Sequence, residues 1–517
     1  MNRTRLTFAA LAVAAALAAP ARAEDLLQVY REARGYDAQF AAAQAALDAG
    51  RERLPQGRAL LLPTVTASAF LNSNEVYRGP PTPVPALTNR TVDFASNGWN
   101  VQLTQPIFRY QNIVQYQQSE YAVMQAESQF GNAVQDLVVR VAQAYFDVLA
   151  AQDNLDFVRA QGRAISEQLA QAKRNFEVGT ATITDTNEAQ ARFDLNKAQE
   201  INAQNDLEVK RRLLVQYIGR VPERLAPLRF GVLLDLPAPN NLEDWSRAAG
   251  EQSYNVRVQE ANYEIAKKEI ERQRAGHLPT LDAVVTYSEG TNQNRAFVGP
   301  NFITQQVYGL QVNVPIYQGG SVLSRTREAA ANAERARQDL ENARRTATLD
   351  AQRAFLSVSN GLAQVKALEQ ALTSSEVSLA SNRVGYDVGV RINIDVLNAE
   401  QQVTSTRRDL AAARYNTIIS GLKLKQAAGT LSEEDVIRVN GLLAQNAQEG
   451  IGIQRGAGSQ TPAGEPALNA PIQAPPGALP RGVQAPGTPA PGTPMPVRPG
   501  TRPQGDLAAP PAAPAKK

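Results

Sequence analysis

Residues 102–108 are Gln-Leu-Thr-Gln-Pro-Ile-Phe, and residues 311–317 are Gln-Val-Asn-Val-Pro-Ile-Tyr, which is the same pattern 209 positions later. Two further pairs keep nearly the same spacing, because Ala-Tyr-Phe at 144–146 and Phe-Glu-Val-Gly at 176–179 each have a counterpart 210 positions on. Leu-Pro-Thr at 62–64 recurs 216 positions later. The two copies therefore differ in length between this Leu-Pro-Thr and the segment that begins at residue 102. The chain therefore consists of two copies of one unit of about 210 residues.

Each copy predicts a pair of strands. Apolar Trp99, Val101 and Leu103 alternate with polar residues, and Tyr308, Leu310 and Val312 do the same in the second copy. Such alternation is typical of a β-strand with one apolar face. We expect four strands of about ten residues or slightly more, joined across loops at 72–95 and 290–303.

Long helices are predicted after each strand pair. Proline is absent from residues 107–221 and 316–461, and both stretches are rich in Ala, Gln, Glu, Arg and Leu. We expect a helix over 111–176, about 100 Å long at roughly 1.5 Å per residue. A Val-Gly turn near Gly179 and Gly389 should interrupt each stretch, and Asp185 and Asp395 should open the returning helices. Single shorter helices are expected before the strands, over 26–61 and about 243–276.

The two ends of the chain have compositions of their own. Residues 1–23 combine basic Arg3 and Arg5 with an apolar run and an Ala-Arg-Ala site, which predicts a secretion signal. Residues 450–517 hold 16 of the 31 prolines and little that can be buried, so we expect a disordered tail. Between them we predict a first repeat (24–219), a linker (220–242), a second repeat (243–430) and a C-terminal segment at mid-height of the helices (431–449).

Composition excludes most catalytic chemistry. The chain has no Cys and a single His, His277, which rules out thiolate metal sites, Cys nucleophiles and His-based triads or zinc clusters. The 53 basic residues against 50 acidic ones include three in the signal, which leaves the remainder formally neutral. Neutral charge without a long basic run argues against nucleic-acid binding. We expect no cofactor and no enzymatic activity, although carboxylate pairs cannot be judged without a pocket.

The alternating strands suit a membrane with lipid on one face and water on the other. Four strands cannot close a barrel, and an open edge in lipid leaves backbone groups unpaired, so other chains must complete it. Two copies give eight strands, which side chains fill, whereas three give twelve and leave an open pore. The alternatives are a coiled-coil rod and a periplasmic β-sandwich.

Over residues 25–430 the sequence resembles the TolC-type outer-membrane efflux proteins. The resemblance rests on the duplication, on the strand ends at 102–108 and 311–317, and on the two segments 178–185 and 386–398. It implies an α+β membrane protein: a homotrimeric 12-stranded β-barrel with four strands per chain, continuing into an α-helical coiled-coil tunnel in the periplasm. It also implies partners, namely a periplasmic adaptor protein and an inner-membrane pump or ABC transporter.

The resemblance assigns roles to residues at the closed end of the tunnel. Tyr386 and Arg391 match residues that hold this entrance shut, and their partners match Thr184 and Asp185. Asp395 matches the outermost of two aspartate rings that select cations, and the second ring is missing because Asn398 stands there. We expect the adaptor at the tips around Gly179 and Gly389.

The same acids have a simpler interpretation. Residues 185–188, Asp-Thr-Asn-Glu, form a plausible capping box, and Asp395 also begins a predicted helix, so both can serve as caps. His277, before Leu-Pro at 278–279, is interpreted as structural.

The predicted function is an outer-membrane duct that exports small molecules, and also proteins, for a partner pump. The rival hypothesis is a soluble periplasmic coiled-coil adaptor or binding protein without a pore.

Overall fold

The computed structural model describes residues 23–78, 90–180, 182–229, 231–292 and 301–444, all within one compact unit, residues 1–455. The predicted secretion signal, except Ala23, and the predicted tail lie outside the described residues.

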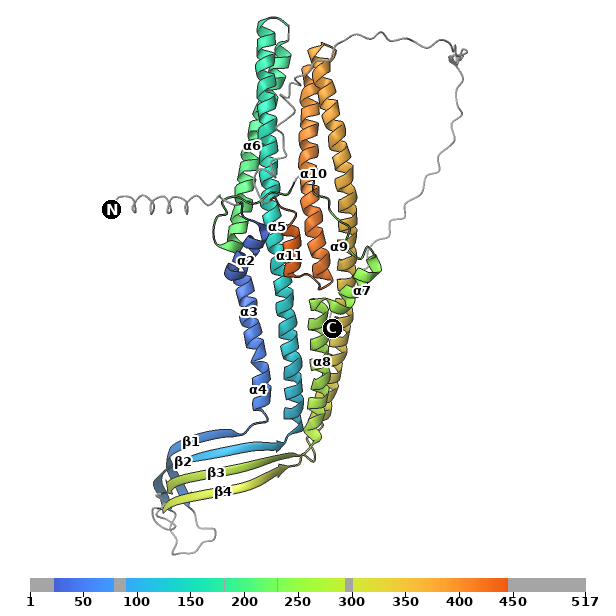
Figure 1. Ribbon diagram of the computed structural model, residues 1–517. Helices are drawn as coiled ribbons and strands as arrows, with labels where there is room; N and C mark the ends of the chain where they lie inside the picture. The colour runs from blue at the N-terminus through green and yellow to red at the C-terminus, as the bar shows by residue number, and fades with distance from the viewer. Residues whose placement is uncertain (1–22, 79–89, 181, 230, 293–300, 445–517) are drawn as a thin grey trace, which may run out of the picture. The chain divides into compact units, whose positions relative to one another are not determined.

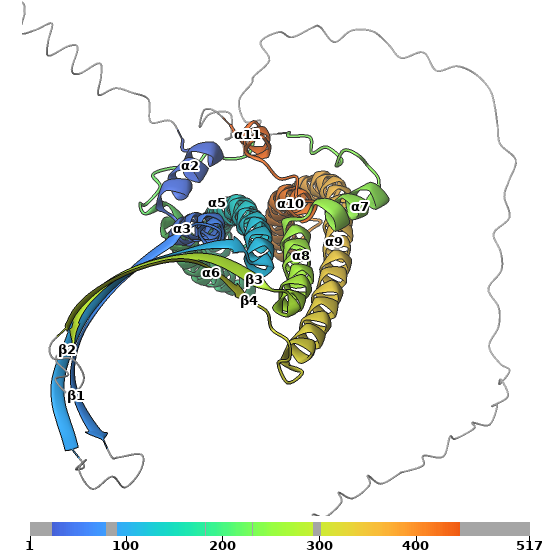
Figure 2. The ribbon, with the colours of Figure 1, turned by 90° about the horizontal axis from the view of Figure 1, so that it is seen from below.

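A four-stranded antiparallel sheet in the order β1-β2-β3-β4 stands at one end of this unit (Figure 1). Figure 2 shows that the sheet is strongly curved. The strands are β1 (Thr64–Arg78), β2 (Arg90–Phe108), β3 (Thr280–Asn292) and β4 (Asn301–Asn313).

The first strand pair is longer than predicted. β1 and β2 have 15 and 19 residues and stay paired out to Arg78 and Arg90, so the predicted loop at 72–95 is too wide. The polar residues taken for a loop support the sheet, since the Asn74 side-chain amide donates to the Phe94 carbonyl (3.3 Å) and to the Ser96 hydroxyl (2.8 Å).

Four long helices confirm the predicted helical stretches. They form two antiparallel pairs, α5 with α6 and α9 with α10, and each pair turns at a Val-Gly sequence. We call α5/α6 the first hairpin and α9/α10 the second. Their bounds are α5 (Tyr110–Glu177), α6 (Ile183–Ile218), α9 (Ser321–Asp387) and α10 (Asn393–Ala427).

Shorter helices lie beside α5 and α9. Near the sheet, α3 and α4 pack on α5, and α8 packs on both α5 and α9; farther away, α6 and α10 take over these places. Thus α3, α4 and α6 lie along α5, and α8 and α10 lie along α9. The short helices are α2 (Leu26–Tyr36), α3 (Ala38–Arg51), α4 (Arg53–Ala59), α7 (Leu242–Gln252), α8 (Tyr254–Arg274), the 3₁₀ turn η1 (Ala275–His277) and α11 (Glu433–Asn440).

The prediction of one unbroken helix before each strand pair is wrong. The first breaks at Asp37, whose carboxylate accepts from the Phe40 amide (2.6 Å) and pairs with Arg140 of α5 at 3.0 Å. Hydrogen bonds from Arg140 and the Phe40 amide outweigh burial and lower the pKa of Asp37. The second breaks at Ser253, where Gly429 lies so close that a Cβ would be 2.4 Å from the Gln252 carbonyl oxygen.

Buried residues of the returning helices recur every seven positions. Among the buried residues, runs at this spacing are formed by Ala189, Asn196 and Ala203 in α6, and by Val396, Val403, Leu410, Thr417 and Leu424 in α10. A seven-residue repeat makes paired helices wind around each other in a left-handed supercoil.

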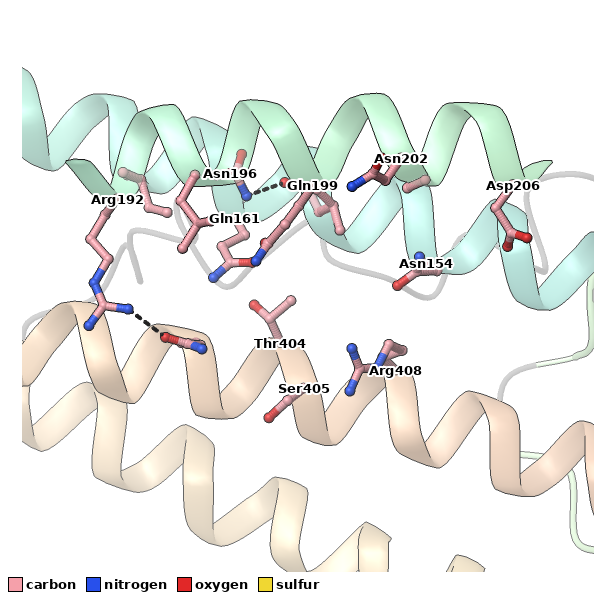
Figure 3. Close-up of a pocket in the computed structure, with 15 residues that line it drawn as sticks. Asn154, Gln161, Arg192, Asn196, Gln199, Asn202, Asp206, Thr404, Ser405 and Arg408 are labelled. Carbon is pink, nitrogen blue, oxygen red and sulfur yellow. Dashed lines mark hydrogen bonds between the residues drawn. The ribbon is translucent and has the colours of Figure 1, made fainter. Parts of the chain in front are cut away.

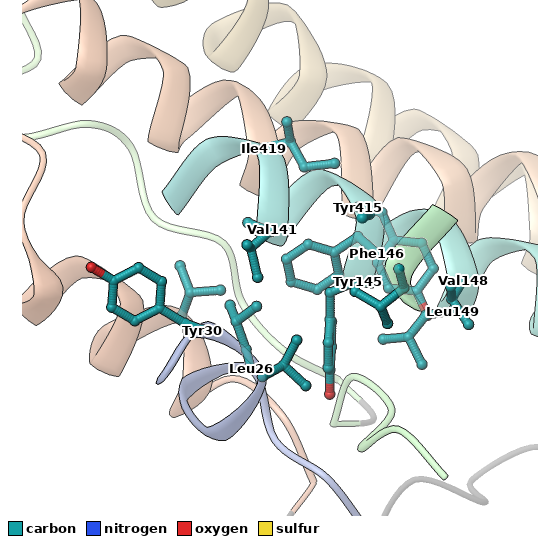
Figure 4. Packing of buried hydrophobic residues seen from close by; sticks show 14 of the residues in the cluster. Leu26, Tyr30, Val141, Tyr145, Phe146, Val148, Leu149, Tyr415 and Ile419 are labelled. Carbon is teal, nitrogen blue, oxygen red and sulfur yellow. The ribbon is translucent and has the colours of Figure 1, made fainter. Parts of the chain in front are cut away.

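The largest core cluster lies where α2, α5, α6, α10 and α11 meet (Figure 4). Phe146 of α5 packs on Tyr415 of α10 with ring centres 5.5 Å apart. The Tyr145 hydroxyl donates to the Ala226 carbonyl at 2.8 Å, which anchors the segment between α6 and α7. The two hairpins are therefore joined at this level, which we call the base. Among the described helices, none is both long and apolar enough to cross a membrane.

Candidate functional site

The candidate site is formed by the tips of the two hairpins, which lie at the end opposite the sheet (Figure 1). Gly179 and Gly389 have φ angles of 79° and 78°, the left-handed conformation that glycine adopts without strain. At both tips the amide of the next residue reaches back to the helix, Thr180 to Asn175 (2.8 Å) and Val390 to Gly385 (2.9 Å). The two turns are thus the same structure built twice.

The first tip is capped by its own side chains. The Thr182 hydroxyl accepts from the Asp185 amide (3.2 Å), and the Asp185 carboxylate accepts from the Thr182 amide (3.0 Å). The capping box is therefore Thr182 with Asp185, and the prediction that Asp185 opens both the helix and the box is wrong. Thr184, in the first turn of α6, is exposed.

The second tip lacks a side-chain cap. Ile392 occupies the N-cap position, where its side chain cannot accept a hydrogen bond, and α10 begins at Asn393. Asp395 is the third residue of the helix rather than its first, so the prediction that Asp395 opens α10 is wrong. Its carboxylate is half-buried and lies 3.6 Å from the guanidinium of exposed Arg391.

Tyr386 links the two tips. The Asn175 side-chain amide of α5 donates to the Tyr386 hydroxyl at 3.4 Å. Neither Tyr386 nor Arg391 bonds to Thr184 or Asp185 among the described residues of this one chain. The latch assigned to these four residues stays a prediction, as does the selectivity ring at Asp395.

Further polar side chains also bridge the hairpins, and apart from Asn398 the sequence did not single them out. The Arg192 guanidinium of α6 donates to Asn398 (3.1 Å) and Gln401 (3.0 Å) of α10, as Figure 3 shows in part. Glu400 accepts from Gln168 of α5 (3.5 Å) and from Arg383 of α9 (3.2 Å). The sequence carries no local signal for bonds between residues more than 200 positions apart.

A groove of about 470 Å³ runs between the first hairpin and α10 (Figure 3). Most of the residues that line it carry amide, hydroxyl or guanidinium groups, such as Asn154, Gln161, Gln199, Thr404 and Arg408, and Val158, Ile165 and Leu195 lie among them. The described residues contain no cluster of three or more His, Cys, Asp or Glu side chains that could hold a metal ion.

At the base, the Tyr415 hydroxyl donates to the Asp153 carboxylate of α5 at 2.6 Å. Burial raises the pKa of Asp153 to about 6, against the lowering effect of this hydrogen bond and with a smaller raising effect from Asp156. This pair is a polar link between the two hairpins at that level.

Comparisons with known proteins identify the family. A profile described as outer membrane efflux protein matches residues 8–220 and 245–430. This chain belongs to that family. It is 34% identical to the outer membrane protein TolC of Vibrio cholerae over 420 residues, which are 81% of this chain and 93% of that protein. It is also 34% identical to the proteases secretion protein PrtF of Dickeya chrysanthemi over 425 residues, 81% of this chain and 91% of PrtF.

Solved structures agree with the fold. The Campylobacter jejuni CmeC outer membrane channel matches with a TM-score of 0.68 and 16% identity, over 81% of this chain and 89% of that one. The predicted fold class is confirmed: this is the channel fold, with four strands per chain and long helical hairpins.

The family also fixes the general function. The chain is an outer-membrane channel protein for efflux and type I secretion, as predicted, and it acts at the outer membrane. The relatives are channels and secretion proteins rather than enzymes, and they give no support to a soluble adaptor.

Proposed function

We propose that three copies of this chain form a passive duct that carries small molecules, and proteins as well, from an inner-membrane pump to the outside. The observation that carries the proposal is the sheet, in which β1 and β4 each have one edge with no partner strand in the described part of the chain. Unpaired edges are not tolerated in lipid, and three such sheets supply the twelve strands of an open barrel.

The outer face of the sheet supports contact with lipid. Leu71 of β1 and Leu310 and Val312 of β4 are exposed apolar side chains on the edge strands. On β4 they alternate with polar Gln311 and Asn313. A transmembrane barrel needs this alternation.

The tips support docking of a partner. Val178, Val388, Val390 and Ile392 are exposed apolar residues grouped on the two turns around Gly179 and Gly389. Exposed apolar groups of this kind mark interaction sites. We assign them to a periplasmic adaptor protein, which connects the duct to an inner-membrane pump or ABC transporter. Cargo that includes proteins is supported by the likeness to a protease secretion protein.

The particle's mass and location test the duct. Extracted from cells without denaturant, the protein should fractionate with the outer membrane as three chains. Reconstituted in planar bilayers, it should conduct ions. A single-chain soluble particle would contradict the proposal.

The gate is tested at Tyr386 and Arg391. Exposed polar contacts are worth about 0.2 to 1 kcal/mol each, which is enough in three copies to bias a gate and weak enough for a partner to break. Tyr386→Phe with Arg391→Ser should raise single-channel conductance several-fold. Arg345→Ser, which removes an exposed ion pair elsewhere on α9, is the control. Conductance as small as that of the wild type would exclude the latch.

The selectivity ring is tested at Asp395. Three Asp395 carboxylates around a constriction should attract cations, although less strongly than two rings would. Asp395→Ala should lower the cation preference measured in planar bilayers, whereas Asp409→Ala on the same helix should change it less. Unchanged selectivity in Asp395→Ala would remove this residue from the filter.

A further inference from the structure

The two strand pairs of the sheet have the same register once the sequence repeat is applied. In the first pair Thr64 lies opposite Thr104, and in the second Thr280 lies opposite Asn313. The sequence offsets of 216 and 209 residues convert the first pair of positions into the second. The repeat is therefore preserved residue by residue in the sheet.

The pairing of β2 with β3, which joins the two strand pairs, serves as a template for pairing the open edges of β1 and β4. β2 and β3 pair with Val101 opposite Tyr287 and Leu103 opposite Val285. By the repeat, β2 corresponds to β4 and β3 corresponds to β1. In a closed barrel, β4 of one copy then meets β1 of the next copy as β2 meets β3 within one chain.

We propose that β4 pairs with β1 of the next copy in this inherited register, with Leu310 opposite Leu71, Val312 opposite Ala69 and Asn313 opposite Ser68. The inference rests on the proposed assembly and adds to it the residue contacts of the seam between copies.

The pattern of apolar residues supports this register independently. Leu310 and Val312 of β4 share a face, as do Ala69 and Leu71 of β1, and the register places these two apolar faces on the same side. A shift by one residue in either direction would turn every side chain of one strand to the opposite face, so the apolar faces of β4 and β1 would lie on different sides.

The end of β4 supplies a second observation. β2 runs to Phe108, where it pairs with Leu281, but β4 ends at Asn313 although the repeat extends to Tyr317. Ile316 and Tyr317 are 94% and 87% exposed, the highest values among the large apolar residues that the structure describes. The template places Tyr317 opposite Val65 of the next copy, so residues 314–317 would complete the strand and be covered on assembly.

One contact of the template does not transfer. Arg109, just after β2, forms a bidentate pair with Asp282 of β3 at 2.7 Å. The corresponding positions at the seam are Gln318 and Thr66, which are uncharged. The seam therefore lacks the counterpart of this ion pair.

The absence of cysteine from the whole chain makes disulfide trapping a direct test. The full-length variant Ser68→Cys with Asn313→Cys is oxidised in outer-membrane preparations and run on non-reducing gels. Directly opposed residues have Cα atoms about 4.5 to 5.5 Å apart, within disulfide reach, whereas diagonal ones are about 7 to 8 Å apart. We expect chains linked to one another, and at least several-fold less linking in the diagonal control Ser68→Cys with Gln311→Cys.

A second matched set keeps the test decisive if the first variant does not fold: Ala69→Cys with Val312→Cys, and its diagonal control Ala69→Cys with Leu310→Cys. Linking that favours the diagonal pairs would overturn the register. A three-chain particle without links in any pair would overturn the seam but leave the trimer. A single-chain particle would overturn the assembly itself.

Discussion

The two hairpins are held together differently at their base and at their tips. At the base, buried Phe146 and Tyr415 pack ring on ring, and a hydrogen bond of 2.6 Å joins Tyr415 to Asp153. At the tips, the links are hydrogen bonds of 3.0 to 3.5 Å from exposed or half-exposed side chains such as Arg192 and Asn175. Buried aromatic residues contribute about 3 to 5 kcal/mol each, and a typical hydrogen bond about 0.5 to 1.5 kcal/mol.

This difference predicts that the tips can move apart without unfolding of the chain. The tips can separate by breaking a few weak bonds, while the base keeps the hairpins in place.

Phe146→Ala should destabilise the protein by about 3 to 5 kcal/mol, because Phe146 is fully buried at the base and its removal leaves a cavity. Thermal unfolding of the purified protein measures the loss. Val178→Ala, at an exposed tip position, is the control and should change the unfolding temperature little. Equal losses in the two variants would end the distinction between base and tip.

Tyr415→Phe should cost about 1 to 3 kcal/mol, because it leaves the Asp153 carboxylate without its hydrogen bond. The pKa of Asp153, about 6, lies above the value near 3.9 of an unfolded Asp, so the folded chain binds this proton more tightly. The contribution of Asp153 to stability therefore falls as pH rises from about 4 to 6.

Losing the lowering hydrogen bond raises this pKa further, so the deficit of Tyr415→Phe should grow as pH rises above about 6, where Asp153 has lost its proton in the wild type but still holds it in the variant. Unfolding temperatures at pH 5 and pH 8 measure the change, with exposed Tyr36→Phe as control. A deficit that is the same at both pH values would show that Asp153 does not titrate at this contact.

Arg192→Leu should cost less than about 1 kcal/mol in global stability, because its bonds to Asn398 and Gln401 are exposed. Hydrogen exchange of the tip segments should nevertheless become faster, and single-channel conductance should rise. Lys197→Met removes another cation of α6, one that pairs with Glu200 of the same helix, and should leave both unchanged. A conductance equal to that of the wild type would mean that Arg192 does not restrain the tip.

Asn398→Asp should have the smallest effect, a gain of a few tenths of a kcal/mol to about 1 kcal/mol at the tip, because a carboxylate strengthens the bond from Arg192. Tip exchange should slow. If only the cation preference of the channel increases, Asn398 faces the pore rather than Arg192 in the assembled protein.

Much of the architecture could be predicted because the sequence repeats it. Long proline-free stretches and the alternation around Trp99 and Tyr308 indicated the helices and strands. The break at Asp37 was missed because its partner, Arg140, lies 103 positions away and is brought close only by folding. The true capping box needed no folding to be found, since Thr182 and Asp185 have the required spacing.

The candidate site was predicted only where its features are local in sequence. Its glycine turns are local features, and both were located correctly. The bridges at Arg192, Asn175 and Glu400 depend on how the two hairpins lie side by side, and the sequence of either hairpin alone does not contain that information.

Asn196 fixes the position of α6 along α5 in the first hairpin. It occupies one of the seven-residue positions of α6 between Ala189 and Ala203, donates to the Val158 carbonyl at 3.2 Å, and fits only because Gly162 opposite it has no side chain. Helices with a uniform seven-residue repeat can slide past each other by one repeat, about 10 Å at roughly 1.5 Å per residue, and pack equally well. A single buried amide removes that ambiguity, and so sets how far the first tip stands from the base.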